Sequence, residues 1–206
     1  SRSRGQFETE PLRIAVAENC ALLARDVLKF KHEEVVAMPD SAQTLQDLNT
    51  RFNANVLFMG DFNDEPYSRS VVDYLLAAKD LDHIEEIIKK ASANAKPPRK
   101  NTPTVRDYLE QKAYLFNCMW PLAGMSDRGS LHYGPGVNTF NLLDQFIVSR
   151  GLLLGQSGLK MLPGTVQVFE APPMASAKKK RPVAFDKKTK KGYSDHFPIE
   201  AVIEVL

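Results

Sequence analysis

The chain has 206 residues, of which 43% are hydrophobic and 25% are charged. These values are those of an ordinary globular protein, and a single domain of this length can bury a substantial core. No apolar run approaches the roughly 18–20 residues that a membrane-spanning helix needs, so the sequence predicts no transmembrane segment.

The net charge of +2 is unevenly distributed along the chain. Residues 174–192 contain eight cations and one acid, a local charge of +7 that leaves −5 for the rest. The cations are Lys178, Lys179, Lys180, Arg181, Lys187, Lys188, Lys190 and Lys191. This basic loop is either a solvated loop or a contact for a polyanion such as nucleic acid, bound through residues 178–191. The lack of an aromatic-rich basic groove argues against strong single-strand binding.

The first half of the chain is predicted to be mostly helical. Residues 9–32 carry apolar side chains at helical spacing, with Thr9 as the expected cap. Val16, Leu23 and Val27 widen this apolar stripe, which predicts a helix packed onto a sheet. The other expected helices cover residues 41–52, 68–78, 82–92 and 105–118.

The strands are predicted from short apolar or alternating runs. Val56–Met59 is an apolar run that predicts a strand buried on both faces. A polar, proline-containing stretch at residues 95–104 predicts a loop. The remaining expected strands are residues 130–133, 140–149, 165–169 and 198–206. Strands interspersed with helices predict one layered α/β domain over residues 1–206.

The stretch Gly60-Asp61-Phe62-Asn63-Asp64 follows the strand at Val56–Met59. If the strand continues, alternation places Asp61 and Asn63 on the same face. Their oxygens are hard ligands that suit Mg²⁺ or Mn²⁺ and can orient water or phosphate. The alternative is a plain turn, because Asp, Asn and Gly all favour turns.

Two further polar groups stand beside predicted strands. Asp195 and His196 precede the last strand, and imidazole can act there as base, acid or electrostatic clamp. Asp144 lies within the apolar run at residues 140–149, and a buried carboxylate is costly unless it is paired. We therefore expect Asp144 to contact His196, whereas the alternatives are an exposed edge-strand Asp144 and a capping Asp195 beside a surface histidine.

Taken together, GDFND, LDQFIVS and SDHFP resemble three motifs of the endonuclease/exonuclease/phosphatase superfamily, in the same order and strand contexts. The resemblance implies an α/β fold of α+β type. This fold is a four-layer α/β sandwich of DNase-like type, with two mostly antiparallel sheets packed face to face between outer helices. It also implies a divalent-metal-dependent phosphoesterase that uses Mg²⁺ or Mn²⁺ and activated water to hydrolyse a phosphodiester or phosphomonoester by in-line attack.

The resemblance also implies a role for each matching residue. Asp61 positions or deprotonates the attacking water or contacts the metal, and Asn63 holds the scissile phosphate. Asp195 is a metal-side ligand. His196 acts as base or phosphate clamp and is oriented by Asp144.

The sequence departs from the family pattern in several places. The family has an Asn, a metal-binding Glu and a further His in its N-terminal part, and no segment here matches them. We therefore expect a chain that is incomplete at its N-terminus, poorly active alone, and partnered by the missing part of the domain. Residues 80–130 resemble a subfamily insertion, and His132 is a weaker candidate for substrate binding. The alternative function is a non-catalytic binding or scaffold domain.

Overall fold

A four-stranded sheet lies at the centre of the molecule. The structure is a computed structural model, and it describes residues 7–39, 41–80, 104–125, 127–133, 139–176 and 181–206. The strand order is β1-β6-β3-β2. These strands are β1 (Leu57–Asp61), β6 (Asp144–Ser149), β3 (Leu115–Asn117) and β2 (Ala77–Ala78). β6 is antiparallel to both β1 and β3, and β2 is parallel to β3.

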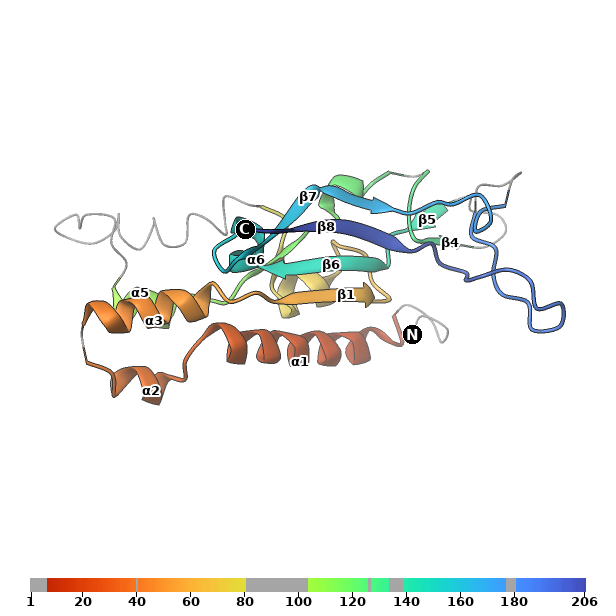
Figure 1. The fold of residues 1–206 in the computed structure, drawn as a ribbon. Coiled ribbons are helices and arrows are strands. Elements are labelled where there is room, and N and C mark those ends of the chain that lie inside the picture. The colour runs from red at the N-terminus through yellow and green to blue at the C-terminus, as the bar shows by residue number, and fades with distance from the viewer. Residues whose placement is uncertain (1–6, 40, 81–103, 126, 134–138, 177–180) are drawn as a thin grey trace.

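A second sheet covers one face of the central sheet (Figure 1). It consists of the antiparallel pair β7 (Leu159–Val168) and β8 (Ile199–Val205). Apolar side chains of β3, β6 and β7 meet in one core cluster, which includes Phe116, Val148 and Met161. Burial of such side chains contributes roughly 1.5–3 kcal/mol each, so the two sheets are held together mainly by the hydrophobic effect.

The long helix α1 (Glu10–Leu28) packs against the other face of the central sheet. Ala17, Ala24 and Leu28 of α1 form a second core cluster with side chains such as Ile147. A shorter helical group lies at one end, where Phe52 and Tyr108 join a third cluster. Its helices are α2 (His32–Val36), α3 (Ala42–Phe52) and α5 (Val105–Glu110). The protein therefore has a mixed α/β fold, as the sequence predicted.

The remaining elements are short. A π-helix, η2 (Ser70–Tyr74), packs on α1, and a 3₁₀ turn, η3 (Trp120–Leu122), follows β3. Helix α6 (Arg150–Leu154) follows β6, while β4 (Leu131–Tyr133) and β5 (Thr139–Asn141) form an antiparallel pair. None of the helices in the described part of the chain is long and apolar enough to cross a membrane.

Several predicted elements differ in the structure. The helix expected over residues 68–78 is the π-helix η2 followed by β2, and the helix expected over 105–118 ends at Glu110 before β3. Pairing of β3 with β6 overrides the helical spacing in that second segment. The run at 140–149 divides into β5 and β6, and neither α2 nor α6 was predicted. The helix expected at 82–92 and most of the loop expected at 95–104 lie outside the described residues.

Two predictions about buried faces are wrong. β1 is an edge strand of its sheet and Met59 is 63% exposed, so the strand is not buried on both faces. The wide apolar stripe predicted for α1 is also wrong, because Val16, Leu23 and Val27 are exposed to solvent. The inward stripe of α1 is narrower and includes a cation, Arg13.

The described part of the basic loop forms an ordered projection, which we call the basic arm (residues 181–193). Figure 1 shows the arm in blue, extending beyond β4 and β5 at the end where β1 terminates. Backbone hydrogen bonds hold it, from Asp186 N to Lys191 O and from Tyr193 N to Val183 O, both at 2.8 Å. Gly192 lies near the end of the arm, four residues before His196.

We expect Gly192→Ala to loosen the basic arm. Gly192 has φ +88°, and an added Cβ would lie 2.2 Å from the carbonyl oxygen of Ala184, so both strain and a backbone clash oppose any other residue. Strain of this kind costs about 1–3 kcal/mol, which should increase the rate of tryptic cleavage after the arm lysines. Gly164→Ala is the control, since its Cβ would meet open space. Equal cleavage rates for both variants would contradict this account of the arm.

Candidate active site

The end of β1 meets the beginning of β6 at one edge of the central sheet. Asp61, the last residue of β1, is the register partner of Asp144, the first residue of β6. The pairing extends one step further, since Phe62 N donates to Leu143 O at 2.8 Å. Two carboxylates from segments more than 80 residues apart are thus placed side by side by the backbone hydrogen bonds of the sheet.

Asn63 reaches this edge through a turn, which corrects the expectation of strand alternation. β1 ends at Asp61, and Asn63 has φ +55°, in the left-handed region that Asn tolerates better than most residues. Its backbone N–H donates to Asp61 Oδ1 at 2.8 Å and its side-chain amide donates to Asp61 Oδ2 at 3.1 Å. The carboxylate of Asp61 and the amide of Asn63 are therefore adjacent because Asp61 closes the turn.

The contact expected between Asp144 and His196 is present. Nδ1 of His196 lies 2.6 Å from Oδ2 of Asp144, and both side chains are largely buried. This distance is short for a nitrogen–oxygen hydrogen bond, and bonds to a charged group are shorter than those between neutral groups. Asp144 thus fixes the ring orientation and leaves Nε2 as the nitrogen available to a ligand.

Ser130 connects both members of this pair, a role that no sequence motif predicted. Its hydroxyl accepts hydrogen bonds from Leu143 N at 3.2 Å and Asp144 N at 3.1 Å. Its carbonyl accepts from Phe197 N at 2.7 Å, and the neighbouring Leu131 bridges to His196. Because Ser130 is fully buried, it holds the backbone of Asp144 and of His196 in one rigid frame. A serine in a loop is too common for its pattern alone to indicate this role.

The pKa of His196 is raised above its ordinary value of 6.5. The hydrogen bond that His196 donates to the Asp144 carboxylate is the largest cause, and the negative charges of Asp144, Asp61 and Asp195 act in the same direction. Burial of the ring acts against them, because it disfavours the charged form. Three of the predicted site carboxylates therefore act on one imidazole and favour its cation.

This shift predicts how stability depends on pH. Because the pKa of folded His196 is raised, its stabilising contribution is complete below the unfolded value and disappears as pH rises through the folded value. We expect the difference in Tm between the parent and His196→Gln to be largest below the ordinary pKa of 6.5 and to shrink as pH rises through the raised pKa of the folded state. His32→Gln is the control, on the exposed α2. A difference that grows with pH would contradict the assignment.

Asp64, the last residue of GDFND, points into the protein. Its carboxylate accepts from Arg13 Nε at 2.7 Å and from Ser70 Oγ at 2.5 Å. The Gln145 amide, itself bonded to Asn117, donates to the Asp64 carbonyl. This buried network links α1, η2, β3 and β6 to the turn that carries Asn63. Asp64 therefore has a positioning role that motif inspection did not reveal.

His132 lies in a different environment from His196. Its ring makes an edge-on contact with Phe140, with centroids 5.0 Å apart, and Phe140 stacks on Phe197 at 6.5 Å. Because Leu131 is the residue that bridges to His196, alternation along β4 directs His132 to the opposite side. The structure thus places His132 in an aromatic group rather than beside Asp144, and substrate binding by His132 stays a prediction.

The described residues fit a metal site only in part. No group of three or more His, Cys, Asp or Glu side chains in that part of the chain could hold a metal ion. Asp61 and Asp195 nevertheless both lie near enough to His196 for their charges to influence it. Mg²⁺ is commonly bound by one or two carboxylates together with water and substrate phosphate, so this donor set is chemically suited to an ion that the substrate helps to hold.

Comparison with known proteins gave one family match. The model described as "Endonuclease/Exonuclease/phosphatase family" matches residues 92–205, just over half of the chain. The match includes Asp144, Asp195 and His196 but not Asp61 or Asn63, and it begins within the segment 80–130 that was predicted to be an insertion. No curated protein and no solved structure matches the chain.

Proposed function

The chain belongs to the endonuclease/exonuclease/phosphatase family, and on that premise we propose that it hydrolyses phosphoesters with the help of a divalent metal ion, Mg²⁺ or Mn²⁺. The observation that carries this proposal is the 2.6 Å contact between Asp144 and His196, placed beside Asp61 at the end of the central sheet. The complete domain would be the four-layer sandwich that the family resemblance implies.

His196 is proposed to bind the scissile phosphate as a cation. The raised pKa favours the cationic form of the imidazole, which suits a phosphate clamp better than a base. Asp144 holds the ring so that Nε2–H is directed towards the ligand. A positioned cation stabilises the negative charge that develops on phosphorus oxygens during hydrolysis. Asn63 adds an amide donor to the same phosphate.

Asp61 and Asp195 are proposed to serve the water and the metal. Asp61 orients the attacking water, and both carboxylates are the candidate metal ligands of this chain. A bound divalent ion would polarise the phosphoryl oxygens and neutralise their charge. The Asn63 hydrogen bonds to Asp61 keep that carboxylate in place before substrate arrives. In this arrangement Asp61 holds the water that attacks the phosphorus atom, and His196 binds the oxygens of the same phosphate group.

The experiment is a metal-dependence assay on the full-length protein. Turnover of bis-p-nitrophenyl phosphate is measured with Mg²⁺, with Mn²⁺ and with excess EDTA, for the parent, His196→Ala and His32→Ala. We expect turnover that requires the metal, that His196→Ala lowers about 100-fold or more, and that His32→Ala leaves unchanged. Absence of metal-dependent turnover on this and other phosphoesters would reject the proposal.

That outcome would support the second candidate, a binding or scaffold domain without catalysis. The observation in its favour is that the described residues assemble no group of three metal-ligating side chains. The ordered Asp144–His196 pair argues against it, because a largely buried carboxylate–imidazole pair is costly to keep without use.

A further inference from the structure

We propose that the basic arm (residues 181–193) binds the backbone of a nucleic acid strand a few nucleotides from the phosphate held at His196. The inference rests on the proposed function, because it takes the position of the scissile phosphate from the candidate active site. It assigns a substrate class and a separate contact surface to that site.

The arm presents cations that the fold itself does not use. Arg181, Lys187, Lys188, Lys190 and Lys191 are all exposed, and none forms an ion pair with another residue of the described chain. The acid of the arm, Asp186, has a structural role instead. It accepts from Thr189 Oγ1 at 2.7 Å and from Lys188 N at 2.9 Å, and so closes the turn at the tip. The arm therefore holds a concentrated positive charge in an ordered turn.

Two aromatic side chains accompany these cations. Phe185 is 53% exposed and Tyr193 is 55% exposed, one on each side of the hairpin that the bond from Asp186 N to Lys191 O closes. An exposed aromatic ring beside cations offers a surface on which a base can stack, worth about 1–3 kcal/mol per base. In the sequence, Phe185 stands two residues before Lys187 and Tyr193 two residues after Lys191, and the structure shows that both rings are exposed.

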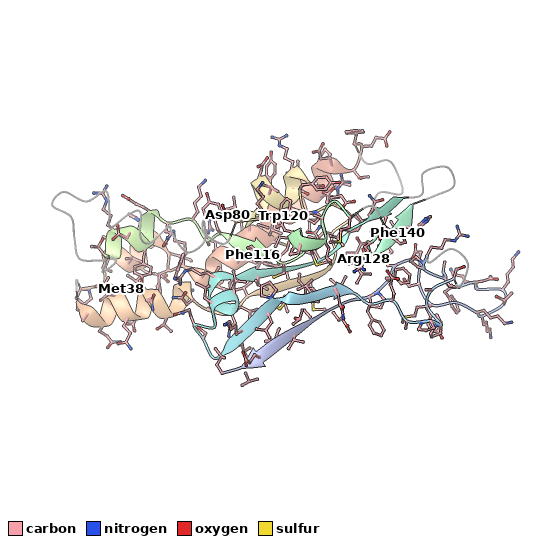
Figure 2. All side chains as sticks on the ribbon, turned by 90° about the horizontal axis from the view of Figure 1, so that it is seen from above. Met38, Asp80, Phe116, Trp120, Arg128 and Phe140 are labelled. Atoms are coloured by element: carbon pink, nitrogen blue, oxygen red, sulfur yellow. The ribbon has the colours of Figure 1, made fainter. Side chains whose placement is uncertain are left out.

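The arm is joined to the active site by a short connection. His196 is five positions after Lys191, a span of at most about 18 Å, which is the rise of about five nucleotides in a helical strand. Figure 1 shows the arm leaving the end of the molecule where β1 terminates, and Figure 2 shows its side chains projecting past Phe140. A phosphodiester chain that leaves the site in this direction would meet the lysines within a few nucleotides.

These features favour nucleic acid over an anionic membrane. The tip, residues 186–191, has the sequence DKKTKK and contains no apolar side chain that could enter a lipid surface. The phosphates of a membrane surface lie in a plane, whereas those of a nucleic acid follow one another along a strand. An arm next to a phosphate-binding histidine suits the second arrangement.

The test measures binding without hydrolysis. Full-length protein in EDTA is titrated against a fluorescently labelled single-stranded DNA of about 20 nucleotides, between about 50 and 200 mM salt, with anisotropy as the readout. The arm variant carries Lys187→Gln, Lys188→Gln and Lys191→Gln. The control carries Lys31→Gln, Arg106→Gln and Lys112→Gln, three exposed cations near α2 and α5, at the end marked by Met38 in Figure 2.

We expect the arm variant to bind at least about tenfold more weakly, with a slope of log K against log salt less steep by about 2, as three lost contacts to a single strand predict. The control variant should bind like the parent. Equal affinities of parent and arm variant, or equal losses in both variants, would overturn the proposal. So would binding of the parent to phosphatidylserine vesicles but not to the oligonucleotide.

A second readout separates this inference from the proposed function. The arm variant should hydrolyse bis-p-nitrophenyl phosphate at the parent rate, because that substrate is too small to reach the arm. If no variant shows turnover but the arm variant alone loses the oligonucleotide, nucleic acid binding by the arm stands, whereas the catalytic proposal and the placement of the strand relative to a scissile phosphate fail. If turnover is present and oligonucleotide binding does not depend on the arm, the reverse holds.

Discussion

Replacement of Asp144 by Asn should lower turnover of the full-length protein by about 100- to 10,000-fold while the fold stays intact. Asn has the same shape and can still accept one hydrogen bond from His196, but it cannot stabilise an imidazolium as a carboxylate does. The backbone N–H of Asp144 would keep its bond to Ser130, so the strand should not move. The measurement is kcat on bis-p-nitrophenyl phosphate, with Asp73→Asn as an exposed control on η2.

The same substitution should lower the pKa of His196. The Asp144 hydrogen bond is the largest cause of its raised value, so a titration followed by NMR should move towards 6.5 or below it, since burial then prevails. This readout distinguishes a positioning carboxylate from one needed only for folding. An unchanged rate together with a lowered pKa would show that the charge of His196 is not used in catalysis.

The local sequence motifs were the most predictable part of the site. A carboxylate in an apolar run requires a partner, and that argument led from Asp144 to His196 across 52 residues. The adjacency of Asp61 and Asn63 was also predicted, but for the wrong reason. Strand alternation and an aspartate-closed turn place the two side chains together equally well, and the pattern GDFND is compatible with both.

Contacts between distant segments were less predictable. The helix expected over 105–118 gives way to β3 because pairing with β6 is a tertiary effect that helical spacing cannot reveal. The sequence contains one signal of such a contact. Arg13 lies four residues before Ala17 on the inward stripe of α1, and a cation in that position indicates a buried acid. This signal predicts a buried acidic partner for Arg13, and the structure identifies the partner as Asp64 of GDFND.

Replacement of Arg13 by Met should destabilise the protein by about 3–5 kcal/mol. The side chains of Arg13 and Asp64 are only 7% and 4% exposed, so removal of the guanidinium leaves a carboxylate in the core without its main compensating charge. The remaining Ser70 hydroxyl cannot neutralise it. The free energy of unfolding in urea is the measurement. Arg106→Met, which breaks an exposed pair with Glu110, is the control and should change little.

A second substitution separates the cost of an unpaired charge from the cost of lost packing. In Arg13→Met combined with Asp64→Asn, neither partner of this ion pair is charged, and Asn can still bond to Ser70. We expect the double variant to recover more than half of the stability lost in Arg13→Met, because unpaired charge rather than missing contact area dominates the single variant. If the double variant is as unstable as the single one, the ion pair is not what fixes the GDFND turn to α1. If it recovers stability but hydrolyses bis-p-nitrophenyl phosphate poorly, the pair contributes to the placement of Asn63 beyond its contribution to folding.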